Sequence, residues 1–134
     1  MKLIVCLDDN LGMMFNHRRQ SRDRVLIADL LGHIGCDRLW ISPYSTPLFP
    51  ADDKNIAVAE DPCGSAGMGD YCFVEDTDPL SRWEDVSEII IYRWHRLYPA
   101  DVRFTGDMTG FYLAETTDFV GSSHDTITKE VWKK

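Results

Sequence analysis

The run Ile89-Ile90-Ile91-Tyr92 constrains the fold of this chain more than any other feature of the sequence. Four consecutive apolar side chains in a strand point alternately to the two faces of a sheet, so both faces must be buried. The run therefore predicts a central strand. The segment Lys2 to Leu7 is a second apolar run of strand length, and it ends in the turn signal Asp8-Asp9-Asn10. We expect this segment to be a buried first strand.

From Ser21 onward, the period of the apolar residues changes to that of an α-helix. Spacings of three and four place one apolar face on this helix, formed by Val25, Leu26, Ile27, Leu30, Leu31 and Ile34. Serine caps helix N-termini well, and glycine commonly ends helices. We therefore expect Ser21 to be the N-cap of one principal helix that stops at Gly32 or Gly35.

Shorter strand patterns occupy much of the remaining chain. They cover residues 38–44, 55–59 and 71–75, and then residues 111–119 and 125–132. The last two are linked by Val120-Gly121-Ser122-Ser123, whose glycine and serines favour a hairpin-like connection. Proline and glycine in residues 60–70 indicate a loop, and residues 79–86 suit a helical turn. This order predicts an α/β protein, with a mixed sheet, one principal N-terminal helix and antiparallel C-terminal strands, in a single domain over residues 1–134.

Composition and charge argue against several classes of protein. The 134 residues are 44% hydrophobic, which suits one domain with one core. A net charge of −8 repels phosphate and anionic lipid, so we expect neither direct nucleic acid binding nor membrane association. The apolar run in residues 3–7 is too short for a signal peptide or a membrane span, so we expect a cytoplasmic protein. The four cysteines and four histidines are dispersed, which predicts buried or partly buried free thiols and no metal site.

Residues 16–24 are the most unusual local sequence, because they hold four arginines in an acidic protein. A helix N-terminus carries partial positive charge and favours Asp or Glu, so arginines there oppose local stability, which often marks a functional site. We expect the backbone N–H groups of residues 21–24 and the guanidinium groups to bind a phosphate or a carboxylate. The candidate ligand-binding residues are Asn16, His17, Arg18, Arg19, Gln20, Ser21, Arg22 and Arg24, with Asp23 orienting an arginine.

An alternative interpretation of the same arginines is structural. The chain has surplus carboxylates, including Asp8, Asp9 and Asp29, and the arginines can pair with them in an intramolecular network. Elsewhere, the run Ser122-Ser123-His124-Asp125 contains the residue types of a serine hydrolase. Adjacent residues on a strand point to opposite faces, so these four cannot form a catalytic triad among themselves.

Two segments resemble dihydrofolate reductase. Near the start, Ile4-Val5-Cys6-Leu7-Asp8-Asp9 followed by Leu11-Gly12-Met13 is similar to the family's first strand and to the mobile loop that covers its active site. Near the end, Ser123-His124 and Thr126-Ile127-Thr128 lead into Lys129-Glu130-Val131-Trp132-Lys133-Lys134, which resembles the family's closing strand. The resemblance implies a dihydrofolate reductase-like fold whose first helix lines the folate pocket. It also places Asp23 within a residue or so of the family's catalytic carboxylate, which binds the pterin ring.

The chain departs from this family where the dinucleotide binds. No Pro-Trp pair follows the mobile-loop segment, and no Gly-Gly pair follows Ile89-Ile90-Ile91 to let the backbone approach a pyrophosphate. Pro43-Tyr44-Ser45-Thr46 stands where the family commonly has Gly-Arg and a Thr, which removes an arginine partner for an NADP phosphate. We therefore expect no cofactor and no working reductase.

The arginine-rich segment carries a second resemblance. Its pattern Phe-Asn-x-Arg-Arg-Gln-Ser-Arg-Asp is similar to that of short bacterial proteins that bear the name ribonuclease Z. That nuclease family activates water through a zinc-binding His-x-His-x-Asp-His motif, and this sequence has nothing similar to it. The residues do not support a nuclease.

Three functional hypotheses follow. The leading one is a domain that keeps a pocket beside the first helix and binds a small anionic ligand or an acidic partner segment through Arg18, Arg19, Arg22 and Arg24. The second is a dihydrofolate reductase-like enzyme in which Asp23 donates or accepts a proton, if burial raises its pKa. The third is an acidic interaction or inhibitor protein that covers the basic surface of a nucleic-acid-binding partner. The first predicts that Arg18, Arg19 and Asp23 converge on a concavity, and the third predicts a convex acidic face. A homo-oligomer is compatible with all three.

Overall fold

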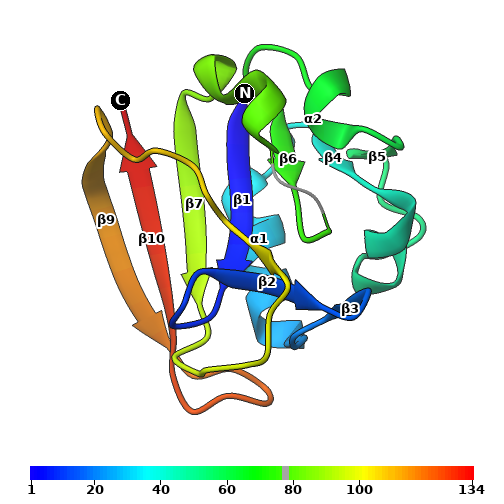
Figure 1. Cartoon of the computed structure of the whole chain (residues 1–134). Helices are drawn as coiled ribbons and strands as arrows, with labels where there is room; N and C mark the ends of the chain where they lie inside the picture. Colours follow the sequence, from blue (N-terminus) through cyan, green and yellow to red (C-terminus); the bar gives the residue numbers. More distant parts are fainter. Residues whose placement is uncertain (77–78) are drawn as a thin grey trace.

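A seven-stranded mixed sheet forms the centre of the molecule (Figure 1). The structure is a computed structural model, and it describes residues 1–76 and 79–134. The strand order is β5-β4-β6-β1-β7-β10-β9. Strands β1 (Lys2–Leu7) and β7 (Glu88–Arg93) run parallel to each other near the middle, as their apolar sequences predict. The two alternating sets of side chains, such as Ile90 and Ile91, belong to different core clusters on opposite faces of the sheet.

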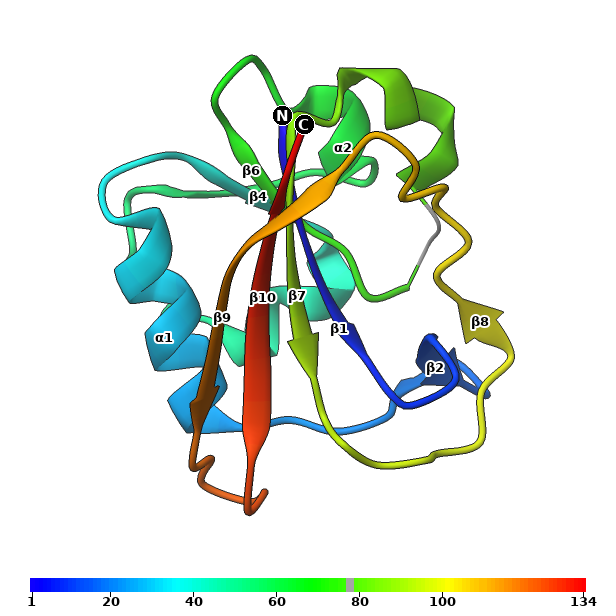
Figure 2. The ribbon, with the colours of Figure 1, turned by 90° about the vertical axis from the view of Figure 1, so that its left-hand side faces the viewer.

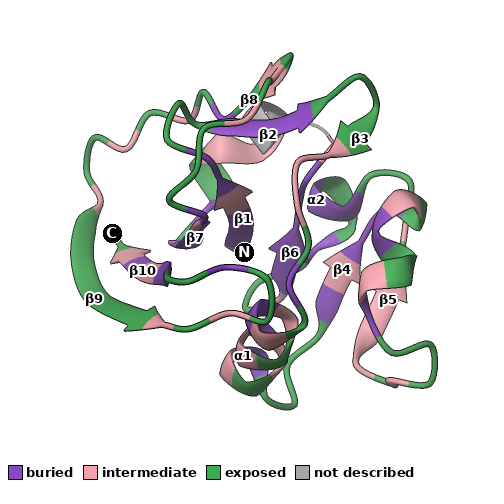
Figure 3. Ribbon diagram, turned by 90° about the horizontal axis from the view of Figure 1, so that it is seen from below, coloured by how far each residue is buried: buried purple, intermediate pink, exposed green. Residues whose placement is uncertain are grey.

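The other strands extend the sheet on both sides of this central pair. On one side, β6 (Tyr71–Phe73), β4 (Leu39–Ile41) and β5 (Ile56–Val58) continue it in parallel. On the other side, β10 (Ile127–Lys133) and β9 (Tyr112–Phe119) are antiparallel. The predicted α/β class, with its mixed sheet and antiparallel C-terminal end, is therefore confirmed. Figure 3 shows that β9 is an exposed edge strand, whereas β1 and β6 are buried.

The helix α1 (Arg24–Ile34) covers one face of the sheet, where it buries Leu26, Leu30 and Ile34 (Figure 2). Its N-cap is Asp23, so the prediction of Ser21 as the cap is wrong. Asp23 is the better cap because its carboxylate accepts two N–H groups of the first turn. Gly35 ends the helix with a φ of 59°, which confirms one of the two predicted stops. The segment η1 (Pro43–Leu48) is a 3₁₀ helix that follows β4, and Leu48 packs in the core cluster on the α1 face.

The opposite face of the sheet is covered by short elements (Figure 2). These are α2 (Pro62–Ser65), the 3₁₀ segment η2 (Pro79–Asp85), and a second sheet of three strands, β3 (Arg18–Arg19), β2 (Gly12–Phe15) and β8 (Val102–Arg103). The second sheet was not predicted, because strands of two to four residues are too short to show a hydrophobic period. Residues 60–70 were predicted to be a loop, but α2 lies within them.

The second sheet changes the interpretation of the arginine-rich segment. Asn16 and His17 form the turn between β2 and β3, with φ values of 51° and 61°. Two consecutive residues with positive φ are typical of the tight turns that join antiparallel strands. Arg18 and Arg19 therefore belong to a hairpin before the helix, and not to the helix entry itself.

The four cysteines are free thiols, as expected. Cys36 is exposed, however, so the expectation that all four are at least partly buried is wrong for this residue. No group of metal-binding side chains large enough to hold an ion occurs in the described part of the chain. Within residues 1–76 and 79–134, no helix has both the length and the apolar character needed to cross a bilayer.

Candidate functional site

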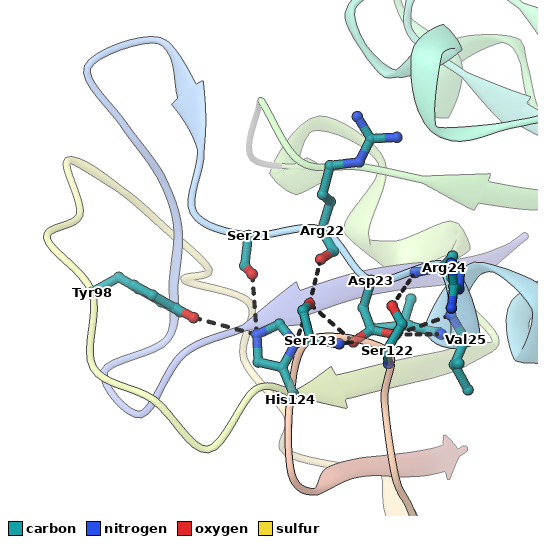
Figure 4. A network of polar contacts seen from close by, with 10 residues as sticks. Ser21, Arg22, Asp23, Arg24, Val25, Tyr98, Ser122, Ser123 and His124 are labelled. Atoms are coloured by element: carbon teal, nitrogen blue, oxygen red, sulfur yellow. Dashed lines mark hydrogen bonds and ion pairs between the residues drawn. The ribbon is translucent and has the colours of Figure 1, made fainter.

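Asp23 connects the start of α1 to the distant loop between β9 and β10 (Figure 4). Its side chain is buried, and Oδ1 accepts the N–H groups of Val25 at 2.9 Å and Leu26 at 3.2 Å. From the loop, the N–H of Ser122 donates to Oδ1 and the N–H of Ser123 donates to Oδ2, each at 2.9 Å. The carboxylate thus joins two segments that are about a hundred residues apart in the chain.

These hydrogen bonds determine the charge of Asp23. Burial alone raises the pKa of a carboxyl group, but the N–H groups of Ser122 and Ser123 outweigh burial here. The pKa of Asp23 therefore lies well below its ordinary value. The condition set for catalysis by Asp23, that burial raises its pKa, is therefore not met, and a carboxyl group that stays ionised is a poor proton donor.

His124 is the next residue in this cluster, and it is also buried. Its Nδ1 lies 3.0 Å from Oδ2 of Asp23, and its Nε2 lies 3.0 Å from Oγ of Ser21 and 3.3 Å from the hydroxyl of Tyr98. The imidazole stacks on Trp94, with 4.5 Å between ring centroids and 26° between planes. A carboxylate on one ring nitrogen and packing on one ring face fix the orientation of the imidazole.

Gly121 permits the close approach of this loop to the helix. A Cβ at this position would overlap the carboxylate of Asp23 and would lie 2.8 Å from Cδ1 of Ile127. The predicted hairpin-like connection between β9 and β10 is confirmed, and its loop packs against the N-terminus of α1. Neither Ser122 nor His124 lies in a strand, so the argument that neighbouring side chains point to opposite faces does not apply to them.

Arg19 is neutralised by Glu75 just after β6. Its Nε lies 2.9 Å from Oε1 of Glu75, and Nη2 donates to Oε2 at 3.3 Å and to the carbonyl of Tyr44 at 3.1 Å. Glu75 is buried and also accepts the hydroxyl of Ser45 at 2.6 Å. This ion pair leaves Arg19 with little charge to offer a ligand.

The carboxylates that were expected to pair with the arginines have other partners. Asp8 accepts the side-chain amide of Gln20 at 3.0 Å, together with backbone N–H groups of its own turn. Asp29 accepts the hydroxyl of Tyr92 at 2.6 Å and pairs with Lys129 at 3.1 Å. Arg19 does pair with a carboxylate of the protein, Glu75, whereas Asp8, Asp9 and Asp29 form no salt bridge with an arginine among the described residues.

The remaining arginines lie beside two different hollows. Arg18 is exposed on a hollow of about 290 Å³ between the β2–β3 hairpin and Tyr98, and Asn16 and Gln20 line the same hollow. Arg22 and Arg24 are exposed on a second hollow of about 320 Å³ beside α1. The apolar lining of this second hollow comes from Ile27, Ala28, Leu31, Leu48 and Pro50. Arg18 therefore does not converge with Arg22 and Arg24.

A small cavity of about 20 Å³ adjoins the second hollow, and both share Arg22, Asp23, Ile27 and Leu48. Ser21 and Arg19 also line it, together with Cys6, Phe73 and Trp94 from the ends of the central strands. The carboxyl ends of parallel strands are the usual ligand site of open α/β sheets. Here side chains largely fill that position, because 20 Å³ holds about one water molecule.

The N–H groups at the start of α1 already have acceptors. Asp23 accepts from Val25 and Leu26, and the hydroxyl of Ser122 accepts from the N–H of Arg24 at 3.1 Å. The N–H groups of residues 24–26 are therefore not free for an anion, and an anion beside α1 would contact the guanidinium groups or the N–H groups that precede Asp23.

We compared the chain with known proteins. No protein-family model matches it, and no curated protein matches its sequence. Among solved structures, it is similar to dihydrofolate reductase from Enterococcus faecalis complexed with NADP(H) and RAB-propyl, with a TM-score of 0.66. The match covers 98% of this chain and 94% of that chain at 9% sequence identity. The chain has a dihydrofolate reductase-like fold. At this identity the similarity concerns the fold alone.

The dihydrofolate reductase-like fold and the observed site agree only in part. The first helix does line a hollow, with Asp23 at its N-terminus, as the resemblance implies. The role of His124 and of its loop as partners of Asp23 was not predicted from the sequence. These contacts join parts of the chain that are about a hundred residues apart. The only local signal was the presence of Ser, His and Asp residue types in residues 21–23 and 122–125.

Proposed function

We propose that this protein binds a small organic anion with an apolar body in the hollow beside α1. The single observation that carries the proposal is the composition of that hollow, which combines two exposed arginines with an aliphatic lining. Ligand pockets are commonly apolar with a few charged groups that fix the ligand's orientation. Arg22 and Arg24 would hold the acid group, and Ile27, Leu31 and Leu48 would contact the apolar body.

The charges around the hollow support an anionic ligand. Neither Arg22 nor Arg24 forms a salt bridge with another described residue, in contrast to Arg19. Figure 4 shows the Arg22 side chain extending away from the Asp23 carboxylate. Arg24 stands at the first position of α1, where the helix dipole disfavours a cation. A bound carboxylate or phosphate would offset this unfavourable charge.

The site beside α1 is concave, as the binding of a small ligand requires. Arg18 and Arg19 have no part in this proposal, since Arg18 lies on the other hollow and Arg19 is paired with Glu75. Ligand binding is therefore proposed for two of the four arginines.

Thermal unfolding in the presence of aromatic carboxylates and aryl phosphates tests the proposal. A ligand at a hundred times its dissociation constant stabilises the folded state by about 2.7 kcal/mol, which raises the melting temperature by several degrees. We expect this shift to be lost in Arg22→Ala and Arg24→Ala and kept in Arg18→Ala, the matched control on the other hollow. A shift that is lost only in Arg18→Ala would place the ligand in the hollow at the β2–β3 hairpin and contradict the proposal. The absence of a shift with every probe would also contradict it.

A further inference from the structure

We propose that Ser21, His124 and Asp23 act together to let Ser21 attack the carbonyl carbon of a small carboxylic ester. The inference deepens the proposed function and rests on it, because the hollow beside α1 would hold the acidic or apolar part of that ester. The three side chains come from two distant segments, Ser21 and Asp23 before α1 and His124 from the β9–β10 loop. They are therefore not the neighbouring residues 122–125 that share these residue types.

The distances are those of a nucleophile, a general base and an orienting carboxylate. Oγ of Ser21 lies 3.0 Å from Nε2 of His124, and Nδ1 of His124 lies 3.0 Å from Oδ2 of Asp23. Both contacts are within the hydrogen-bond reach that proton transfer requires. The base is held by a third group, as in serine hydrolases of unrelated folds, which are recognised by geometry and not by order in the chain.

The tautomer of His124 follows from the charge of Asp23. Since the carboxylate stays ionised, it can only accept hydrogen bonds, so Nδ1 donates its proton to Oδ2. Oγ of Ser123 lies 3.1 Å from Nδ1, but it donates to the carbonyl of Arg22 and to Oδ2 of Asp23. In a neutral imidazole, Nε2 then has the free lone pair and accepts the hydroxyl of Ser21. The hydroxyl of Tyr98, at 3.3 Å, competes for the same lone pair but lies farther away. This is the protonation state that a general base needs.

Ser21 is accessible, although His124 and Asp23 are buried. It is partly exposed, and it lines the small cavity that adjoins the hollow beside α1. A cavity that holds about one water molecule also has room for the oxygen of a carbonyl group. The larger hollow, which shares Arg22 and Ile27 with it, has room for the rest of the ester.

Positive groups lie near the position where negative charge would develop. No described residue accepts a hydrogen bond from the backbone N–H of Ser21 or of Arg22. The N–H of the residue that follows a nucleophilic serine is a common donor to the oxyanion. Arg22 would thus contribute its backbone N–H, with its guanidinium on the rim adding positive charge.

The reaction proceeds in two balanced halves. Oγ of Ser21 forms a bond to the carbonyl carbon while its proton moves to Nε2 of His124. The bond from that carbon to the alcohol oxygen then breaks, and Nε2 returns the proton to the departing alkoxide, which leaves an ester on Ser21. Water adds to this ester, gives a proton to Nε2, and releases the carboxylic acid as Oγ takes that proton back. Asp23 keeps its charge throughout.

The hydrogen bonds that join α1 to the β9–β10 loop do not need the hydroxyl of Ser21. The link between α1 and the loop is complete with the backbone N–H groups of Ser122 and Ser123 and with Nδ1 of His124, all of which donate to Asp23. The contact between Ser21 and Nε2 is additional, and it lies on the side of the imidazole that faces away from the carboxylate.

Covalent labelling with a small uncharged fluorophosphonate tests the inference. The reagent phosphonylates activated serines, and peptide mapping by mass spectrometry locates the modified residue. We expect modification of Ser21 in the wild-type protein, none at this position in Ser21→Ala, and an unchanged rate in Ser65→Ala, which removes the hydroxyl of an exposed serine in α2. In His124→Gln the rate should fall by about a hundredfold or more, because general bases contribute 10²–10⁴.

Labelling of the wild-type protein is a test on its own, in case His124→Gln does not fold. An unlabelled Ser21 in the wild-type protein, or an unchanged rate in a folded His124→Gln, would overturn the inference. Because the reagent is uncharged, its reaction reports on Ser21, whereas thermal stabilisation by carboxylates reports on the hollow. Stabilisation without labelling would therefore remove this inference alone and leave the proposed function intact.

Discussion

At the start of α1, neighbouring charged side chains differ in sign, in burial and in the number of their polar partners. Asp23 is buried and accepts hydrogen bonds from residues on both sides of the cluster. Arg22 and Arg24 flank it, are exposed, and form no salt bridge with a described residue. The buried carboxylate stabilises the helix N-terminus, so the fold tolerates two cations there. We infer that Asp23 contributes stability and that the arginines contribute binding.

The largest expected effect is that of Asp23→Ala. The substitution removes the helix cap and leaves buried N–H groups of α1 and of the loop without an acceptor. Hydrogen bonds to a charged group contribute about 1.5–3 kcal/mol each, so we expect a loss of about 3–5 kcal/mol in the free energy of unfolding. Urea denaturation measures this loss, with exposed Asp9→Ala as the control. A loss below about 1 kcal/mol would mean that Asp23 contributes no more than an ordinary helix cap, and would contradict its role in joining α1 to the loop.

The pH dependence of stability provides a second test of Asp23. A carboxyl group whose pKa is lower in the folded state stabilises the protein above its unfolded pKa, which is near 3.9, and this contribution is lost as the pH falls toward the folded pKa. We therefore expect the free energy of unfolding to decrease below about pH 4 in the wild-type protein. Asp23→Asn should show a smaller decrease, which is measured by denaturation from pH 6 to pH 2.5. The pKa values of Asp8 and Asp70 are also lowered, and they contribute equally to both proteins. Identical pH profiles would contradict the assignment.

Replacement of Arg19, like that of Asp23, should lower the free energy of unfolding, in contrast to replacement of the exposed arginines. Arg19→Met leaves the buried carboxylate of Glu75 with the hydroxyl of Ser45 as its remaining side-chain partner. Because Arg19 is partly exposed, we expect a loss of about 1–2 kcal/mol, less than the 3–5 kcal/mol of a fully buried pair. A double-mutant cycle with Glu75→Gln isolates the interaction. Additive effects of the two substitutions would show that the pair contributes nothing.

The sequence predicted the central part of the fold well. The apolar runs at β1 and β7 each span both faces of the sheet, so their burial could be inferred without knowledge of their neighbours. Helix α1 was predicted from its period, although its cap was assigned two residues too early. The strands β2, β3 and β8 were missed because they depend on pairing with one another, and pairs such as β2 and β8 are far apart in the chain.

The candidate site was less predictable for a physical reason. The hypothesis about residues 16–24 treated the arginines as one group, whereas the structure places them in different surroundings. Their roles depend on Glu75 and on the hollow formed with Leu48 and Pro50, which lie in other segments. His124 was set aside because only its sequence neighbours were considered as partners, whereas its actual partners are Ser21, Asp23 and Tyr98.

The smallest expected effect on stability comes from replacing Arg24, and this replacement should stabilise the protein, unlike the others. Arg24 is exposed at the first position of α1, where a negative side chain interacts favourably with the helix dipole. Arg24→Glu should therefore raise the free energy of unfolding by about 0.3–1 kcal/mol, with Arg24→Ala between the two. The same substitution should abolish stabilisation by aromatic carboxylates, because it places a negative charge beside their acid group. Denaturation with and without such a carboxylate measures both effects. If Arg24→Glu instead unfolds the protein or keeps the ligand effect, the division between a stabilising Asp23 and binding arginines is wrong.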